Sequence, residues 1–307
     1  MDDSPMRIAV IASTRDPAGM NIKDKLLEQG FEETEDEFDG HKVYVFRDAE
    51  RQGDSGPGEE EAREARLYTT DTDSVKCENI DERISETGFR PDLLIFATKH
   101  AAESGIRSLS VHVQGNWGRA DLGGRERQLC IAPASYLRAA LLKLDELNEQ
   151  LSGQEGDKFS VIQECTHHGP YVETPSMFIE IGSKDPEWRD PEAGRIIART
   201  IISLIREKPT PCRAIFGIGG MHHTPEFSKI IRRKDYAVGH VCPKYAVESL
   251  DRDMIRQAIE RTSENNAERG QDVMVVLDWK GLPAGKERIT AMLDELGISF
   301  RKTKELT

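Results

Sequence analysis

The sequence has no apolar run of membrane-spanning length, so it predicts no transmembrane helix. Its first residues, MDDSPMRIAVIAS, carry acids where a secretory signal peptide would carry a basic segment. Its five cysteines are an odd number and never occur in C-x-x-C spacing, which argues against a disulfide framework and against a thiolate zinc knuckle. We therefore expect a cytoplasmic protein with reduced cysteines.

The chain also lacks an excess of basic residues, because 55 acidic side chains against 42 basic ones give a formal net charge of −13. That balance provides no overall attraction to nucleic acid or anionic lipid, so a polyanionic partner would need a local basic patch. A solvated surface is the alternative interpretation of any such patch. Three short stretches are candidates: GRADLGGRERQ (Arg119, Arg125, Arg127), IIRRKD (Arg232, Arg233, Lys234) and FRKTKE (Arg301, Lys302, Lys304).

No clean internal repeat or linker divides the 307 residues. Apolar segments typical of strands, such as RIAVIAS, DLLIFAT and VMVVLDW, alternate with amphipathic segments such as PASYLRAALLKLDELNEQL. This alternation predicts an α/β fold with helices on both faces of a central sheet, and two strand pairs without an intervening helix predict a mixed sheet. We expect one domain over residues 1–307, with a mobile insertion at 48–65, where glycine, proline and charged residues concentrate.

Several of the predicted strands run directly into histidines. In open α/β sheets, sites form at the carboxyl ends of strands, so we expect these loops to meet at one rim of one sheet. The histidines are His100 in LLIFATKHAAESG, His167 and His168 in VIQECTHHG, and His222 and His223 in IFGIGGMHH. His112 in SLSVHV and His240 in YAVGHV are placed to join them, whereas His41 precedes a strand and should lie elsewhere.

Each of these histidines, taken alone, is more readily explained as a hydrogen-bonded structural residue than as a ligand. Collectively they suggest chemistry, because imidazole is a common zinc ligand and the usual proton carrier at neutral pH. HAAE (His100, Glu103) and HTPE (His223, Glu226) are both H-x-x-E, a spacing that lets an imidazole and a carboxylate meet one metal ion. About one such match is expected by chance, so the spacing is weak support.

Two other features beside the histidines have both a functional and a structural interpretation. The glycines of GIGG (Gly217, Gly219, Gly220) either aim backbone N–H groups at an anion or oxyanion, or simply permit a tight turn. Cys165 precedes His167 by two residues and could form a nucleophilic pair with a histidine. Catalytic pairs usually meet through the fold, so a buried structural thiol is the favoured interpretation.

Taken together, several motifs make the chain resemble the archaeal-type D-aminoacyl-tRNA deacylases, a family that also occurs in plants. They are RIAVIASTRDPAGMNI, FATKHAAESGIRSLSVHVQGNWG, ECTHHGPYVETPSMFIEIGS, GIGGMHHTPEFSKI and VGHVCPKYA, which follow in order through nearly the whole chain. The resemblance implies a zinc-dependent enzyme that hydrolyses the ester joining a D-amino acid to tRNA. It also implies a three-layer α/β/α sandwich of the phosphorylase and peptidyl-tRNA hydrolase type.

The resemblance and ligand chemistry together define an expected site. We expect the metal at a subset of His100, Glu103, His223 and Glu226. The remaining ligands or proton carriers would be His167, His168 and His222, with the roles among them left open.

The expected partner is D-aminoacyl-tRNA, met by Arg232, Arg233 and Lys234 at the end of the HTPEFSKI helix. No membrane and no obligate protein partner are expected. Two alternatives stay open: a metal-dependent peptidase or amidohydrolase on a related fold, and a nucleotide- or RNA-binding module in which the histidines are structural. A basic track leading to the histidines would favour the deacylase.

Overall fold

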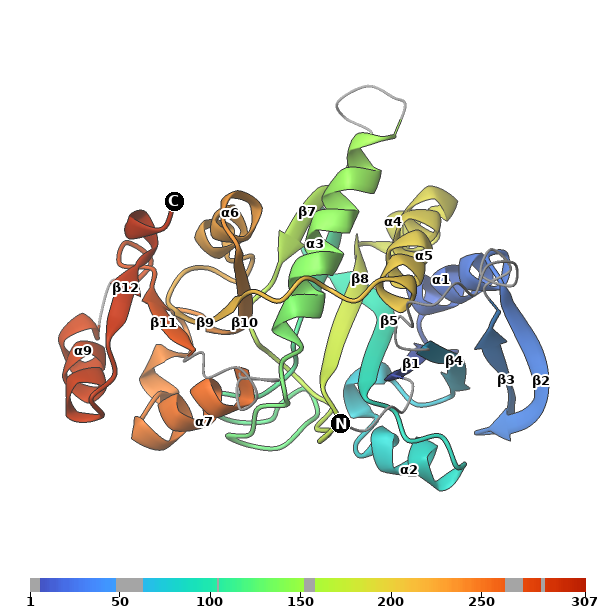
Figure 1. Cartoon of the computed structure of the whole chain (residues 1–307), viewed down its shortest axis with the longest axis horizontal. Coiled ribbons are helices and arrows are strands. Elements are labelled where there is room, and N and C mark those ends of the chain that lie inside the picture. Colours follow the sequence, from blue (N-terminus) through green and yellow to red (C-terminus); the bar gives the residue numbers. More distant parts are fainter. Residues whose placement is uncertain (1–5, 48–62, 104, 152–157, 263–272, 283–284) are drawn as a thin grey trace, which may run out of the picture.

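The computed structural model describes residues 6–47, 63–103, 105–151, 158–262, 273–282 and 285–307. Its strands form two sheets rather than the single central sheet that was expected (Figure 1). The eight-stranded sheet has the order β2-β3-β4-β1-β5-β8-β6-β7, and the four-stranded sheet has the order β10-β9-β11-β12. The predicted insertion at 48–65 lies outside the described residues over 48–62, and residues 63–65 begin strand β4.

The larger sheet is mixed, as predicted. β1 pairs in parallel with β4 and β5, β5 with β8, and β6 with β7, whereas the β2–β3, β3–β4 and β6–β8 pairs are antiparallel. Its strands are β1 (Met6–Ser13), β2 (Phe31–Phe38), β3 (His41–Phe46), β4 (Arg63–Thr70), β5 (Leu93–Ala101), β6 (Ser108–His112), β7 (Ser160–Gln163) and β8 (Ser176–Ser183). The smaller sheet is parallel and contains β9 (Arg213–Ile218), β10 (Tyr236–Cys242), β11 (Met274–Leu277) and β12 (Phe300–Lys302).

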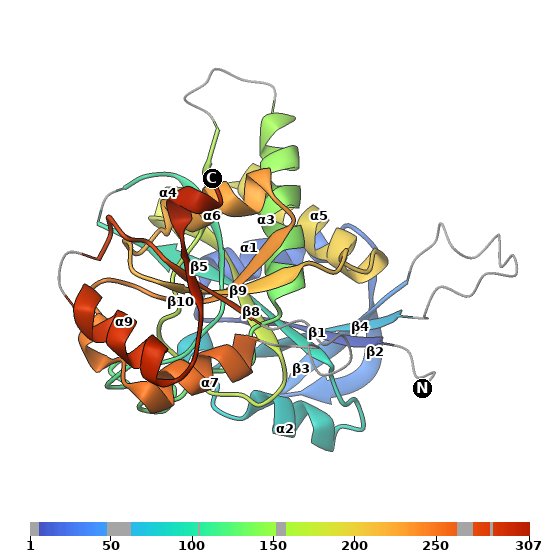
Figure 2. The same cartoon turned by 60° about the vertical axis from the view of Figure 1, so that its left-hand side comes forward.

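Helices cover both faces of the larger sheet, with α1, α4 and α5 on one side and α2 on the other (Figure 1). Helices α3 and α6 join the two sheets, because each contacts both β7 and β10. Figures 1 and 2 both place the C-terminal turn beside α6, which it contacts. The helices are α1 (Pro17–Leu27), α2 (Ile80–Glu86), α3 (Ala134–Glu149), α4 (Asp185–Trp188), α5 (Pro191–Arg206), α6 (Pro225–Arg233), α7 (Arg252–Thr262) and α9 (Lys286–Glu295).

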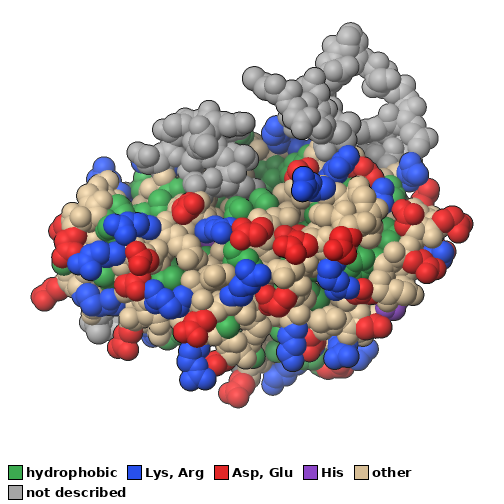
Figure 3. Space-filling view, turned by 90° about the horizontal axis from the view of Figure 1, so that it is seen from below, with side chains coloured by type: hydrophobic (Ala, Val, Ile, Leu, Met, Phe, Trp, Pro, Cys, Tyr) green, Lys and Arg blue, Asp and Glu red, His purple; other side chains and the backbone are tan. Residues whose placement is uncertain are grey.

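One hydrophobic core spans the two sheets. It contains Ile8, Phe96 and Ile179 from the larger sheet together with Val238 and Val276 from the smaller one, all of them buried. Burial of apolar surface therefore holds the sheets together and stabilises the loops between them. On the outside, Figure 3 shows one face of the molecule, where acidic and basic side chains are interspersed and no basic patch gathers.

Asp16 fixes the start of α1 against the end of β5. Its Oδ1 atom accepts hydrogen bonds from the N–H groups of Ala18 and Gly19, both at 2.9 Å, and Oδ2 accepts from Lys99 N–H at 3.0 Å. We expect Asp16→Ala to lower the free energy of unfolding by about 1–2 kcal/mol, because these donors would be left unpaired. Denaturant titration measures this. The matched change Asp24→Ala, at an exposed position of the same helix, should cost less than about 0.5 kcal/mol, and an equal loss at both positions would contradict the capping role.

Candidate functional site

The registers of β5, β8 and β6 bring polar residues to one face of the larger sheet. Glu180 of β8 is paired with Thr98 on one side and with Ser110 on the other. Thr98 Oγ1 donates to Glu180 Oε1 at 2.8 Å, and Ser110 Oγ donates to Oε2 at 3.5 Å. His100 and His112 each lie two residues farther along their strands, so they point to the same face as Glu180.

Two loops bring further histidines over this face. His167 and His168 come from the loop after β7, and His222 and His223 come from the loop after β9. The two loops are joined, because Cys165 N–H donates to the His222 carbonyl at 2.8 Å. The prediction that these histidines meet is confirmed, since the His167 and His222 ring centroids are 4.5 Å apart and those of His222 and His223 are 5.6 Å apart.

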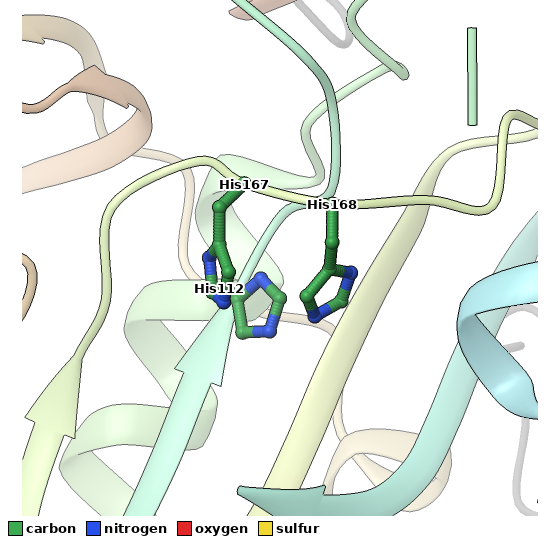
Figure 4. Close-up of side chains that lie close together, drawn as sticks. All are labelled: His112, His167 and His168. Atoms are coloured by element: carbon green, nitrogen blue, oxygen red, sulfur yellow. The ribbon is translucent and has the colours of Figure 1, made fainter. Parts of the chain in front are cut away.

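The meeting place is a face of the sheet and not its carboxyl rim. β6 runs antiparallel to β8, so the carboxyl end of β6, at His112, lies beside Phe178 near the start of β8. Figure 4 shows His167 and His168 extending from their loop toward His112 at the end of β6. The centroid of the His112 ring is 4.3 Å from that of His167 and 4.9 Å from that of His168.

His112, His167 and His168 have the orientation that a metal site requires. Each Nδ1 atom lies near a backbone carbonyl, that of the next residue for His112 (3.3 Å) and His168 (2.6 Å), and that of Cys165 for His167 (2.9 Å). An Nδ1–H donor leaves Nε2 unprotonated in a neutral ring, as in known metal-binding histidines. Burial lowers the pKa of His167 well below its usual value and that of His168 to about 4, so both rings are neutral.

Buried atoms without partners support this interpretation. One donor atom from each of the three histidines lies within 4.8 Å of the others. Within the described part of the chain, His112 Nε2 and His100 Nε2 are buried and have no hydrogen-bond partner. Native proteins rarely leave buried polar atoms unpaired, so these atoms indicate a missing ligand. The donor set therefore fits a metal ion.

Glu164 connects the other histidines to this group. It is fully buried, and its Oε2 atom lies 2.7 Å from His222 Nε2, while Oε1 lies 3.1 Å from His100 Nδ1. Burial would raise the pKa of Glu164, but the hydrogen bond from His222 and the nearby His112 and His100 rings together outweigh it, so the pKa lies below its usual range. Burial likewise would lower the pKa of His222, yet its hydrogen bonds to Cys165 and Glu164 raise that pKa to about 10. The site therefore contains a buried ion pair.

Tyr245 and Cys165 complete the surroundings of His222. The Tyr245 hydroxyl lies 3.3 Å from His222 Nδ1 and 3.3 Å from Cys165 Sγ, which is itself 3.5 Å from His222 Nδ1. Cys165 is fully buried, as the structural interpretation of this thiol requires. Burial, reinforced by Cys165, raises the pKa of Tyr245, so its hydroxyl stays protonated and can donate a hydrogen bond.

The H-x-x-E carboxylates are not brought to this cluster. Glu226 lies in the first turn of α6 and bonds Lys229 at 2.6 Å, and Glu103 is exposed. Among the described residues, the groups of donors close enough to share a metal include His100 but not Glu103, His223 or Glu226. His223 lies nearby, with its ring centroid 5.7 Å from that of His100.

Sequence reasoning missed Glu164 and Glu180, and it placed His112 near the other histidines without assigning it a role. A signal was present, because Glu180 is the one carboxylate in the apolar segment MFIEI, and Glu164 ends the similar segment VIQE. A charged residue inside a strand that is otherwise buried must be paired or functional. His41 and His240 fall outside the cluster: His41 bonds Asp71 at 3.0 Å, and buried His240 lies 3.0 Å from the hydroxyl of Thr166.

The glycines of GIGG do not present free N–H groups to an anion. Gly219 and Gly220 have φ angles of 100° and 87°, and their N–H groups donate to the carbonyls of Cys242 (2.8 Å) and Gly281 (3.2 Å). The oxyanion interpretation therefore fails for these two residues, and the turn interpretation holds. At Gly217, an added Cβ would lie 2.6 Å from Phe227 Cζ.

We therefore expect Gly217→Ala to act through packing. The free energy of unfolding should fall by about 1–3 kcal/mol, because the new methyl group overpacks against Phe227. Thermal unfolding measures this, and adding Phe227→Leu should recover part of the loss. A Gly217→Ala protein that unfolds like the wild type but has lost its activity would instead indicate an anion-binding role.

The basic stretches are largely occupied by partners within the chain. Arg232 makes two hydrogen bonds to Asp145 of α3, at 2.7 and 2.9 Å, and a third to the Val161 carbonyl at 2.7 Å. It therefore fastens α6 to its neighbours, whereas Arg233 and Lys234 are exposed at the end of that helix.

In the GRADLGGRERQ stretch, Arg127 pairs with Asp251 at 2.5 Å and Arg125 lies over the Tyr171 ring. A basic track leading to the histidines is thus reduced to a few side chains. Among the residues that the structure describes, no helix combines the length and apolar character needed to cross a bilayer.

The chain is similar to proteins of known family. Residues 87–301 match the family model described as D-aminoacyl-tRNA deacylase. The chain is 37% identical to the D-aminoacyl-tRNA deacylase of Thermococcus kodakarensis (95% of this chain, 98% of the relative) and 35% identical to that of Pyrococcus furiosus (95% and 99%). Among solved structures, a conserved protein of unknown function superimposes with a TM-score of 0.81 at 26% identity, covering 98% of this chain and 96% of that one.

Proposed function

The chain belongs to the D-aminoacyl-tRNA deacylase family, and we propose that its cluster of histidines and glutamates hydrolyses the ester between a D-amino acid and tRNA. The observation that carries the assignment to this site is the convergence of His112, His167 and His168 beside the buried carboxylates Glu164 and Glu180. Hydrolysis adds water to the ester carbonyl, breaks the carbon–oxygen bond to the ribose and returns a proton to the ribose oxygen. The products are a free D-amino acid and tRNA.

We propose zinc as the metal, held by His112, His167 and His168. Three protein ligands are typical of a catalytic zinc, and the carbonyls beside the Nδ1 atoms favour the tautomer in which Nε2 is free to bind it. When bound, zinc lowers the pKa of a water molecule and polarises the ester carbonyl. The Oε1 atom of Glu180 lies 3.7 Å from His112 Nε2, so this buried carboxylate faces the same space as the proposed ligand atom.

His222 is the proposed proton carrier. Its side chain is 34% exposed, so it reaches both the substrate side and the buried Glu164 to which it is hydrogen bonded. Glu164 orients the ring and stabilises its charged form, and Tyr245 contacts the other ring nitrogen. In this arrangement His222 can deliver the proton that the departing ribose oxygen needs.

The remaining expectations are also proposals. The larger sheet, with α1, α4 and α5 on one face and α2 on the other, is consistent with a three-layer sandwich of the phosphorylase and peptidyl-tRNA hydrolase type. The core shared by the two sheets supports a single domain. A tRNA substrate favours a cytoplasmic location, with no obligate protein partner.

Matched substrates test the function directly. Incubation with D-aminoacyl-tRNA and with the L-aminoacyl-tRNA of the same amino acid should release amino acid from the D form and spare the L form. Acid-gel or thin-layer separation of charged and free tRNA measures both rates. If neither substrate is hydrolysed, the assignment is overturned. Rapid hydrolysis of both would instead indicate a nonselective esterase.

Arg233 and Lys234 remain the best-placed cations for the tRNA backbone. We expect the double change Arg233→Ala and Lys234→Ala to weaken tRNA binding and to flatten the log–log salt slope by up to about 2, roughly one for each lost phosphate contact. Filter binding at several salt concentrations measures the slope. The same charge change on α7, Arg252→Ala with Arg256→Ala, is the control, because α7 lies on the opposite face of the smaller sheet from α6 (Figure 1). An equal effect of both pairs would exclude a specific role for α6.

A further inference from the structure

Exposed apolar side chains gather beside the histidine cluster. The described residues include four large hydrophobic side chains that are strongly exposed: Ile106, Leu122, Met221 and Tyr245. Met221 directly precedes His222, the Leu122 carbonyl accepts a hydrogen bond from Gly169 N–H, and the Tyr245 hydroxyl contacts His222. Single exposed apolar residues are ordinary, but the Tyr245 side chain also contacts the polar site itself, so its exposed ring is a candidate surface for a bound ligand.

Tyr245 has two distinct ends. Its hydroxyl is held inside the site, 3.3 Å from both His222 Nδ1 and Cys165 Sγ, whereas the residue as a whole is 61% exposed. The backbone fixes this position, because Lys244 N–H donates to the Gly220 carbonyl at 2.9 Å and so joins the Tyr245 turn to the loop that carries His222. An exposed aromatic ring is therefore held at a defined place beside the proposed proton carrier.

We propose that the Tyr245 ring stacks on the terminal nucleobase of the tRNA and thereby positions the aminoacyl ester at the histidines, an inference that rests on the proposed function. The ester is carried by a hydroxyl of the terminal ribose, and the nucleobase is attached to the same sugar. A base whose ester lies at His222 must therefore lie close to the side chains that contact His222. Every nucleobase offers a flat π-face, and aromatic side chains bind single-stranded ends by stacking on it.

The charge of the protein favours such a contact. The chain is acidic overall, and Arg232, Arg125 and Arg127 are occupied by partners within the chain. Phosphate contacts alone then contribute less to tRNA affinity than in a basic protein, whereas stacking requires no positive charge.

Removing the terminal nucleobase from the tRNA and removing the ring of Tyr245 should raise KM by similar factors. Tyr245→Ala should raise the KM for D-aminoacyl-tRNA by about 5- to 150-fold, the range measured when a stacking aromatic side chain is truncated, with a smaller change in kcat. For the wild type, a substrate whose terminal nucleotide is abasic should show a similar rise in KM. For Tyr245→Ala, the KM for the abasic substrate should equal the KM for the intact substrate, because the stacking contact is already lost. Tyr245→Phe, which keeps the ring and removes the hydroxyl, should keep the wild-type sensitivity to the missing base.

Other outcomes separate this inference from its alternatives. The stacking proposal is overturned if Tyr245→Phe loses as much as Tyr245→Ala, or if Tyr245→Ala raises KM above that of the wild type by the same factor on the abasic substrate as on the intact one. In either case the residue does not act through its ring on the base. Tyr44→Ala, a matched tyrosine change on the distant strand β3, should leave KM unchanged. A wild-type protein without D-aminoacyl-tRNA hydrolysis refutes the proposed function itself, whereas an active wild type with an unchanged Tyr245→Ala KM refutes only the stacking.

Discussion

Chelation should abolish D-aminoacyl-tRNA hydrolysis by this protein, and added zinc should restore it. The physical reason is that the ester carbonyl and the attacking water both need charge stabilisation that His112, His167 and His168 cannot supply by themselves. We expect His168→Ala to lose the bound metal and to lower kcat/KM by roughly 1000-fold or more, equivalent to about 4 kcal/mol of transition-state stabilisation. Elemental analysis of the purified protein and single-turnover rates measure the two effects.

Glu103 and Glu226 provide matched controls for that experiment. Among the described residues, neither glutamate belongs to a group of donor atoms close enough to bind one metal ion. Glu103→Gln and Glu226→Gln should therefore retain both the bound metal and the hydrolysis rate. Loss of metal in Glu226→Gln would restore the ligand set predicted from H-x-x-E spacing. Full activity of the metal-free wild type would instead assign the chemistry to histidine acting as a general base.

Glu164→Gln should lower kcat/KM by roughly 100- to 10,000-fold, the range that general acid–base groups contribute. The change preserves the shape of the side chain and removes the negative charge that pairs with His222 at 2.7 Å and with His100 at 3.1 Å. Without that charge, the half-buried His222 ring loses the interaction that keeps it protonated and oriented. Hydrolysis rates and circular dichroism melting should be measured together, so that loss of function is separated from loss of fold.

The matched control for Glu164 is Glu173→Gln in the same inter-strand segment. Glu173 pairs with Arg261 at 2.6 Å and is largely exposed, so its removal should change the rate less than about threefold. Because Glu164 is not one of the three proposed zinc ligands, Glu164→Gln should keep zinc bound at His112, His167 and His168. A Glu164→Gln protein with the wild-type rate would exclude the His222–Glu164 pair from the mechanism.

The sequence by itself determined the family and the α/β class with its mixed sheet, and it predicted that His167, His168 and His222 meet. These conclusions depend on properties written locally along the chain: the order of motifs, the alternation of strand and helix patterns, and polar residues that directly follow an apolar strand. The ends of strands can be recognised from the residues next to them, so the loops after strands β7 and β9 could be located without a structure.

Only the tertiary structure decided the composition of the site. His112 and Glu180 meet because β6 pairs antiparallel with β8 in one register, and a shift of β6 by one residue would have placed their side chains on opposite faces of the sheet. Arg232, expected to contact tRNA, is instead bound by Asp145, 87 positions away in sequence. Pairing registers and side-chain partners depend on contacts between distant segments, which spacing along the chain does not encode. For that reason the H-x-x-E motifs pointed to two carboxylates that, among the described residues, belong to none of the close donor groups.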